Sequence, residues 1–426
     1  MSNFQYDRFI PNRTAMDIST SQFSMAQKTD SNDPPRYLDN AAIAYQEEIA
    51  KACGVALDKR ILAFNAEPPA AERDIGRSAY NRPLKPPMHK RKIMQAPEKV
   101  LDAPGMLDDY YLNLLDWSAK NSLAIALESS VYIWNADTGE VQDFCQLADD
   151  NYVASVQFTA DGQYLAVGTN QGETEIWDVE ASSRIRSMKG HASRVSVLSW
   201  NSHVVSSGSR TGNIFHHDVR IAQHKIAELV AHTGEVCGLK WRPDGQLIAS
   251  GGNDNMVNIW DARSSIPQMT KTDHRAAVKA LSWCPWQLNV LSTGGGSADR
   301  HVHFWNTATG NKISSVDTGS QVTSIVWSRE YKEFLTSHGF PNNHLSIWSY
   351  PTLNKIVDLP GHDSRVLHTA ISPDGQTVAS VASDENLKFW KAFESKKKSK
   401  TASSKPLRNV TNEEELVSAT RRLAIR

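Results

Sequence analysis

Tryptophan is absent from the first 116 residues of this 426-residue chain, although 12 tryptophans follow from Trp117 onward. Because tryptophan and other large apolar side chains build globular cores, a core is expected only after that point. The chain has only four cysteines (Cys53, Cys145, Cys237 and Cys284), and none forms a Cys-x-x-Cys pair. Neither a zinc site nor a redox pair is therefore predicted, and such isolated cysteines suit a reducing compartment.

Long apolar runs and a strong excess of one charge are also missing. No apolar stretch approaches about 18 residues, so we expect neither a membrane span nor a secretory signal. The formal net charge is -1, which gives no global field for nucleic acid. The chain has no phosphate-binding glycine loop, paired metal-ligand motif or nucleophile elbow. We therefore expect no enzymatic activity, cofactor or metal, and no binding to nucleic acid or membranes.

Residues 1–95 are polar and are interrupted by proline pairs such as Pro34-Pro35. This composition predicts a segment that is mostly disordered when free, with a short helix over Asn40 to Ala52. Two islands in it, residues 7–13 and 59–64, place apolar side chains beside basic ones with no core to bury them. Each island is either a chance feature of a linker or a short docking motif that orders on binding.

From Pro97 the sequence repeats one unit. A clear copy ends in Trp260-Asp261, preceded by the alternating apolar residues Val257 and Ile259. Markers at this position recur about every 40–45 residues, which is the length of a four-stranded WD-type blade. The seven markers are Trp134, Trp177, His217, Trp260, Trp305, Trp348 and Trp390. The spacing predicts an all-β, seven-bladed WD40 propeller over residues 96–393, with disordered tails over 1–95 and 394–426.

A ring of blades must also be closed. The first marker lies near the start of the repeats, so we expect part of Pro97 to Tyr111 to supply a strand that completes the last blade. After Phe393 the chain turns basic and polar, and it is predicted to be flexible when alone. A short helix is predicted there over Asn412 to Arg422.

Four residue types recur together in the repeats. The sets are His232, Ser250, Asp254 and Trp260, and again His362, Ser380, Asp384 and Trp390. A catalytic triad occurs once, not once per blade, and it needs an oxyanion hole. We therefore interpret the repeated Asp as an acceptor within a tight turn, linked to the Trp through the His and Ser. Function is then expected in the loops on the faces and rim of the propeller.

Four segments of the repeat region stand out together, and they are Leu101-Asp102-Ala103-Pro104, Asp109-Tyr110-Tyr111-Leu112-Asn113-Leu114, Ser206-Ser207-Gly208-Ser209-Arg210 and Glu235-Val236-Cys237-Gly238-Leu239. In these segments the chain resembles the Fizzy family, the WD-repeat co-activators of the anaphase-promoting complex, a multi-subunit ubiquitin ligase. The first island looks like the family's C-box and the chain end like its Ile-Arg tail, both of which dock onto the ligase. The residues implied are Asp7, Arg8, Phe9, Ile10, Pro11 and Arg13 for the C-box, and Ile425 and Arg426 for the tail.

Within the family, residues 216–220 and 283–287 are similar to the mitotic branch. Arg60, Ile61 and Leu62 resemble that branch's basic-Ile-Leu element, which binds the HORMA-type spindle-checkpoint protein. The alternatives are the Fizzy-related branch, which acts at mitotic exit, and a non-catalytic WD-repeat scaffold of another complex. A plain scaffold needs neither a C-box nor an Ile-Arg tail, so these motifs favour a co-activator.

The resemblance also implies two degron sites. The destruction box of a substrate, an extended peptide with an Arg and a Leu three residues on, lies in the family in a groove between the first and last blades. The implied residues are Asp102 and Glu385 for its Arg, and Leu101, Tyr132 and Trp134 for its Leu. The Lys-Glu-Asn degron binds on the top face. Its implied residues are Asp109 for the Lys, Arg365 for the Glu, and Asn253, Asn255, Ser297 and Gln321 around the Asn.

In the family such a propeller brings substrates to the ligase and performs no catalysis itself. The partners implied for this chain are ligase subunits, degron-bearing substrates such as cyclins and securin, and spindle-checkpoint proteins. The resemblance places this activity in the nucleus and the cytoplasm.

Overall fold

The computed structural model describes residues 39–54, 93–148 and 150–394. Within these ranges the one helix is α2 (Asn40–Ala52), which has the predicted bounds, and its alanines and glutamates favour a helix. No helix in the described ranges is both long and apolar enough to cross a membrane. The tails predicted to be disordered lie largely outside the described residues, as does the helix predicted over 412–422.

The described strands form seven four-stranded antiparallel sheets, numbered here as blades in chain order. Blade 1 consists of β2 (Leu115–Trp117), β3 (Ser122–Leu127), β4 (Ser130–Asn135) and β5 (Val141–Gln146). Blade 2 consists of β6 (Val153–Phe158), β7 (Tyr164–Thr169), β8 (Thr174–Asp178) and β9 (Ser183–Met188). Blade 3 consists of β10 (Val195–Asn201), β11 (Val204–Ser209), β12 (Asn213–Asp218) and β13 (Lys225–Val230).

The later blades follow the same plan. Blade 4 consists of β14 (Val236–Trp241), β15 (Leu247–Gly252), β16 (Val257–Asp261) and β17 (Pro267–Lys271). Blade 5 consists of β18 (Val278–Trp283), β19 (Val290–Gly295), β20 (His301–Asn306) and β21 (Lys312–Asp317). Blade 6 consists of β22 (Val322–Trp327), β23 (Glu333–His338), β24 (Leu345–Ser349) and β25 (Lys355–Leu359). Blade 7 consists of β26 (Val366–Ile371), β27 (Thr377–Ala382), β28 (Asn386–Lys391) and β1 (Lys99–Asp102).

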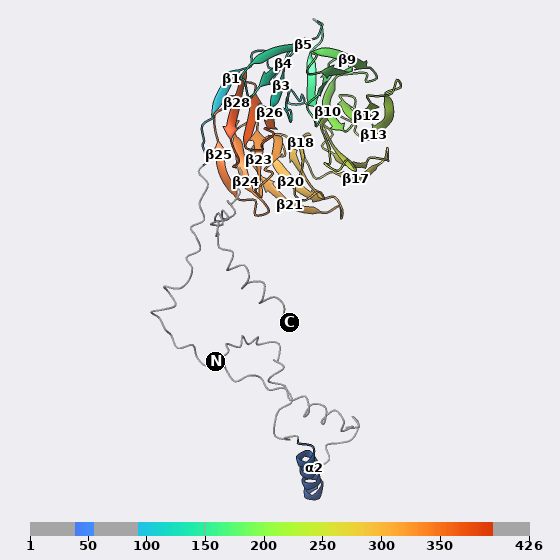
Figure 1. Cartoon of the computed structure of the whole chain (residues 1–426), viewed down its shortest axis with the longest axis vertical. Coiled ribbons are helices and arrows are strands. Elements are labelled where there is room, and N and C mark those ends of the chain that lie inside the picture. The colour runs from blue at the N-terminus through green and yellow to red at the C-terminus, as the bar shows by residue number, and fades with distance from the viewer. Residues whose placement is uncertain (1–38, 55–92, 149, 395–426) are drawn as a thin grey trace, which may run out of the picture. The chain divides into compact units, whose positions relative to one another are not determined.

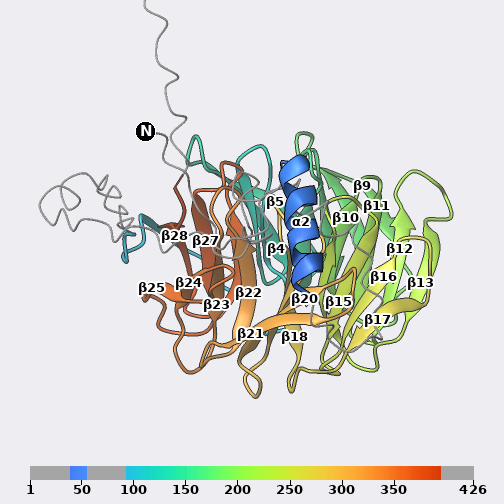
Figure 2. The same cartoon turned by 90° about the horizontal axis from the view of Figure 1, so that it is seen from below.

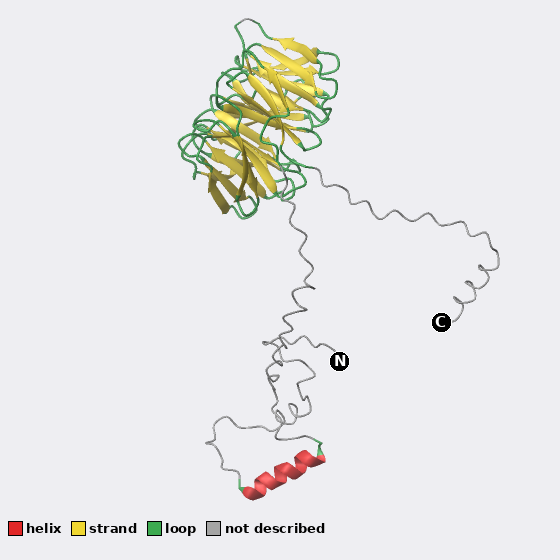
Figure 3. Cartoon of the chain, turned by 90° about the vertical axis from the view of Figure 1, so that its left-hand side faces the viewer, coloured by secondary structure: helices red, strands yellow, loops and turns green. Residues whose placement is uncertain are grey.

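The blades form a ring, in which the outer strands β5, β9, β13, β17, β21 and β25 follow one another around the rim (Figure 1). The first strands of neighbouring blades contact one another around the central channel. Burial falls from the inside outward: all but one residue of β14 is buried, whereas β17 alternates between half-buried and exposed positions. The predicted fold, a seven-bladed all-β propeller, is confirmed (Figure 3).

The ring is closed by a strand from the start of the domain. Strand β1 pairs with β28 in antiparallel register, from Lys99 opposite Phe389 to Asp102 opposite Asn386. The predicted closing strand is therefore confirmed, and it covers what would be the open outer edge of β28. This closure also brings the chain just before blade 1 against blade 7.

The repeated His, Ser, Asp and Trp form a hydrogen-bonded tetrad inside a blade. In blade 4, His232 Nδ1 lies 3.0 Å from Asp254 Oδ2 and its Nε2 lies 2.8 Å from Ser250 Oγ, while Trp260 Nε1 donates to that hydroxyl at 2.9 Å. The equivalent distances in blade 7 are 3.0, 2.7 and 2.8 Å. These side chains satisfy one another's buried polar atoms, so the structural interpretation is confirmed.

Sequence reasoning missed a third tetrad in blade 5, because a threonine replaces the serine. There His274 lies 2.5 Å from Asp299 and 2.7 Å from Thr293 Oγ1, to which Trp305 donates at 2.9 Å. The atoms of His274, Asp299 and His303 that could bind a metal ion lie within 4.8 Å of one another. The hydrogen bonds of the tetrad already explain why His274 and Asp299 lie so close together.

Candidate functional site

A groove of about 630 Å³ lies where blade 7 meets blade 1. Strand β1 contributes Leu101 and Asp102 to its walls, and β4 contributes Tyr132 and Trp134. Trp134 is 6% exposed and its ring packs 4.6 Å from that of Phe389, so it forms a rigid wall. Four of the five residues predicted for the destruction box therefore line one groove. Their binding role stays a prediction.

Glu385, the fifth residue, lies in the turn between β27 and β28 with a left-handed φ of 57°. Its backbone carbonyl accepts the N–H of Ala103 at 2.7 Å, and its Oε1 accepts the N–H of Gly105 at 3.1 Å. Because Gly105 lines the groove, this carboxylate fixes the groove's rim. Its Oε2 makes no hydrogen bond within the described residues and stays available to a ligand.

The groove has further walls that sequence reasoning missed. They are Ile125, Leu127, Glu128, Val141 and Leu387. The available signal was the apolar run of residues 123–127 along β3, but only the register shows that Ile125 lies opposite Tyr132. Glu128 is exposed and its side chain lies against Gly105, which adds another carboxylate to a groove that already contains Asp102.

The residues predicted for the Lys-Glu-Asn degron all fall on one face of the ring. We call it the top face, the end where the second strand of each blade turns into the third; Figure 2 shows strands running between the two faces. Three of these residues lie in turns between a second and a third strand: Asn253 and Asn255 in the β15–β16 turn and Ser297 in the β19–β20 turn. The others lie before a first strand: Gln321 just before β22, Arg365 just before β26, and Asp109 in the β1–β2 connection. The connection that leads into the first strand of a blade also lies at this face, because the first two strands are antiparallel and the second strand therefore ends at the face where the first strand began.

The β1–β2 connection is tied to several blades across the top face. Tyr110 is 6% exposed and its hydroxyl donates to the carbonyl of Val322, in blade 6, at 3.2 Å. Asn113 Nδ2 donates to the carbonyls of Ser196, in blade 3, at 2.8 Å, and Cys237, in blade 4, at 3.1 Å. The connection therefore lies over the central channel and holds Asp109 in a fixed place.

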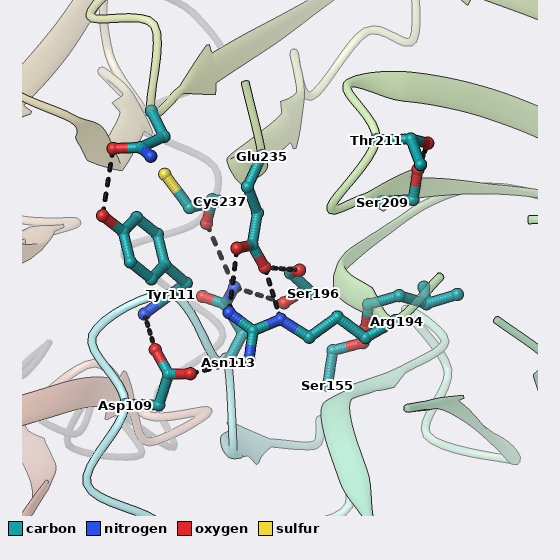
Figure 4. A network of polar contacts seen from close by, with 12 residues as sticks. Asp109, Tyr111, Asn113, Ser155, Arg194, Ser196, Ser209, Thr211, Glu235 and Cys237 are labelled. Carbon is teal, nitrogen blue, oxygen red and sulfur yellow. Dashed lines mark hydrogen bonds and ion pairs between the residues drawn. The ribbon is translucent and has the colours of Figure 1, made fainter. Parts of the chain in front are cut away.

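Asp109 belongs to a polar network on the top face (Figure 4). Its Oδ1 accepts the N–H of Tyr111 at 2.9 Å, and its Oδ2 pairs with Arg194 Nη1 at 2.7 Å. Arg194 also forms a two-pronged pair with Glu235, at 2.7 and 2.8 Å. The hydroxyl of Tyr111 donates to Asn253 Oδ1 at 3.0 Å. These five residues, with Arg210 and Gly234, line a pocket of about 470 Å³.

Arg365 lies on the same face but pairs with the neighbouring acid. Its Nε donates to Asp108 Oδ1 at 2.5 Å and its Nη2 to the Asp108 carbonyl at 2.6 Å. Its Nη1 makes no hydrogen bond within the described residues. The backbone of Gln321 pairs with Gly339 and Phe340, and the side chains of Gln321 and Arg365 both flank Gly339.

Two further predicted residues are less closely connected. Asn255 has a left-handed φ of 65° and its N–H donates to the carbonyl of Gly252 at 3.2 Å, so it shapes the turn. Ser297 is exposed, and its carbonyl accepts from Arg300 Nε at 2.9 Å. Neither side chain bonds to the other predicted degron residues within the described ranges. The structure thus joins Asp109 to Asn253 through Tyr111, whereas Asn255 and Ser297 form separate parts of the face.

Three sets of predicted residues lie outside the described ranges. They are the C-box over 7–13, the checkpoint-binding element over 60–62 and the Ile-Arg tail at 425–426. Their roles stay predictions from the sequence.

The fold and the two recesses define a WD40 binding propeller with a groove at the ring closure and a polar pocket on one face. The profile of the CDC20/Fizzy WD40 domain matches residues 101–390. The chain therefore belongs to the CDC20/Fizzy family, as its motifs predicted.

Similar proteins agree with this assignment. The WD repeat-containing protein slp1 of Schizosaccharomyces pombe is 53% identical over 393 residues, covering 91% of this chain and 78% of slp1. The anaphase-promoting complex subunit cdc20 of Dictyostelium discoideum is 48% identical over 367 residues, covering 82% of this chain and 73% of its own. A chain in a crystal structure of the mitotic checkpoint complex is similar with a TM-score of 0.70 and 58% identity, covering 71% of this chain and 98% of that one.

Proposed function

We propose that this chain is a substrate-recognising co-activator of the anaphase-promoting complex, which binds destruction-box and Lys-Glu-Asn degrons and directs ubiquitination of cell-cycle proteins. Family membership, and the name of the Dictyostelium relative as a subunit of that complex, support the ligase partnership. The observation that carries the degron assignment is that four of the five residues implied for the destruction box line one groove, whereas those implied for the Lys-Glu-Asn degron lie on the top face, where Asp109 and Asn253 share a pocket. Both recesses suit peptide binding, and ubiquitin transfer is left to the ligase.

The groove between blades 7 and 1 suits the destruction box. Leu101 and Tyr132 give it an apolar wall for the degron leucine, and the exposed carboxylate of Asp102 lies beside them. A guanidinium beside carboxylates forms short, directional, charge-assisted hydrogen bonds. In an extended peptide the Arg and the Leu three residues on are about 10 Å apart, so one groove can hold both.

The top face suits the Lys-Glu-Asn degron. Asp109 offers a carboxylate for the degron lysine, and the unbonded Nη1 of Arg365 offers a donor for the degron glutamate. Because Asn253 Oδ1 accepts from Tyr111, its amide nitrogen is left to donate to the degron asparagine. The degron glutamate shares Arg365 with Asp108, whose carboxylate is exposed and so easily displaced.

The same proposal includes the spindle checkpoint. The similar solved chain comes from a mitotic checkpoint complex, which supports a checkpoint protein as a partner of this chain. The Arg60-Ile61-Leu62 element then serves as the strand that adds to the partner's sheet. We place this activity in the nucleus and the cytoplasm, where the family's ligase and its substrates meet.

Peptide titrations of the full chain test the proposal. A labelled destruction-box peptide and a labelled Lys-Glu-Asn peptide should each saturate binding, and neither should displace the other. Asp102→Asn should weaken only the first peptide and Arg365→Gln only the second, while the anaphase-promoting complex co-precipitates with both variants. Mutual displacement, or two variants that each weaken both peptides, would show that the recesses are assigned wrongly.

A further inference from the structure

The Arg194–Glu235 pair occupies equivalent positions in two neighbouring blades, just before β10 and just before β14. Both residues are buried, at 9% and 6% exposure. Glu235 uses both oxygens on the guanidinium, accepts a hydrogen bond from the Ser196 hydroxyl, and accepts the N–H of Asn253 on its backbone carbonyl at 2.8 Å. A buried pair of this kind keeps its geometry because both partners are fully satisfied.

This pair decides how much charge Asp109 can offer. Arg194 would neutralise Asp109 if it had no other partner, because the ion pair between them is only 2.7 Å long. Burial is the largest single influence on the pKa of Arg194 and lowers it, but the hydrogen bonds to Glu235 and Tyr152, together with the charges of Glu235 and Asp109, outweigh burial and raise the pKa, so the guanidinium stays charged. With Glu235 included, the three residues carry two negative charges and one positive charge. The exposed Arg210 also lines the pocket but bonds to neither carboxylate.

The same contacts fix the shape of the degron site. Asp109 is held at both oxygens, by Tyr111 and by Arg194, and its remaining lone pairs are free for a ligand. Asn253 is held at its backbone by Glu235 and at its side chain by Tyr111. One buried pair thus supports the residue for the degron lysine and a residue for the degron asparagine.

We propose that Arg194 and Glu235 are positioning residues that set the preference of the top-face site for a cation at the first degron position. Glu235 offsets the charge of Arg194, so the three residues together keep a net charge of −1, which Asp109 presents to the degron lysine. The proposal rests on the assignment of the top face to the Lys-Glu-Asn degron. It adds two residues that would act without touching the peptide.

The test compares a Lys-Glu-Asn peptide with a matched Met-Glu-Asn peptide, and takes the ratio of the two affinities for each protein. Wild type should favour the lysine peptide by about tenfold, the worth of one charge-assisted contact. Glu235→Gln removes one negative charge and should bring the ratio close to one. The double variant Arg194→Gln with Glu235→Gln restores the net charge of −1, so the ratio should recover even where both peptides bind more weakly.

The destruction-box peptide serves as the internal control and should bind all these variants as it binds wild type. Arg194→Lys, which keeps the charge but loses the two-pronged geometry, should keep the ratio while weakening both top-face peptides. If the two residues have a purely structural role, the double variant should show a lower affinity ratio than Glu235→Gln, and that result would overturn the proposal. An unchanged affinity ratio in Glu235→Gln would overturn it as well. If wild type binds no Lys-Glu-Asn peptide at all, the top-face assignment itself is wrong.

Discussion

Asp384 and Glu385 are adjacent acids in the same turn of blade 7, yet the structure gives them different tasks. Asp384 completes a buried tetrad, whereas Glu385 is exposed at the rim of the groove. Replacing each carboxylate by the amide of equal size, Asp384→Asn and Glu385→Gln, removes one charge and leaves the volume unchanged. We expect the first change to lower stability and the second to lower affinity for the destruction box.

The cost of Asp384→Asn follows from its hydrogen bonds. Both oxygens lie near His362 Nδ1; Oδ1 also accepts the N–H of Asn386, and Oδ2 that of Asp363, each at 3.1 Å. Whichever way the amide turns, its NH₂ group faces a backbone N–H. One unmade hydrogen bond in this partly buried turn costs about 1–3 kcal/mol, which lowers the melting temperature by roughly 2–5 °C in a domain of this size.

The pH dependence gives a second check on Asp384. Burial is the largest single influence and raises the pKa of this carboxyl, but the hydrogen bond and charge of His362, the N–H of Asp363 and the charge of Lys388 together outweigh burial and hold the pKa at about 2. Because this value lies below the ordinary 3.8, the stabilisation is fully present above pH 3.8 and is lost as the pH falls toward 2. The difference in stability between wild type and Asp384→Asn should therefore shrink over that interval.

Glu385→Gln keeps an oxygen that accepts the N–H of Gly105, so the rim of the groove should keep its shape. Loss of the charge should weaken a destruction-box peptide by about five- to tenfold, because a charge-assisted hydrogen bond becomes a neutral one. Thermal melts and titrations with both degron peptides measure these effects. An early melt of Glu385→Gln, or equal weakening of both peptides, would refute the placement of the groove.

Three further predictions concern other parts of the chain. Lys279 is buried and donates to two backbone carbonyls, and burial lowers its pKa from 10.5 to about 7. Its contribution to the free energy of unfolding should therefore rise between pH 7 and 10.5, and melts of Lys279→Met should lack that rise. Arg8→Ala, or deletion of residues 425–426, should reduce co-precipitation of the ligase with no change in the melt. Alanine at residues 60–62 should abolish checkpoint-protein binding and spare both degron peptides; undiminished binding would make that element a linker.

The sequence alone determined the architecture. Apolar alternation and turn residues act over a few neighbours, so a Trp or His marker about every 40–45 residues predicts the number of blades. The closing strand followed from the need to cover the open edge of the last blade. Two tetrads were found because they repeat with the same residue types; the third, with Thr293 in place of serine, was missed because a strict pattern does not admit the exchange.

The tertiary structure decided the sites. Glu128 faces the groove only because ring closure brings Gly105 of the β1–β2 connection against blade 1. Arg194 and Glu235 meet because two neighbouring blades start at the same face, at a sequence separation of 41 residues. Such contacts depend on the angle between blades and on side-chain rotamers, which no local pattern records. The repeat therefore fixes the blades one by one, whereas the chemistry between them is set only when the ring closes.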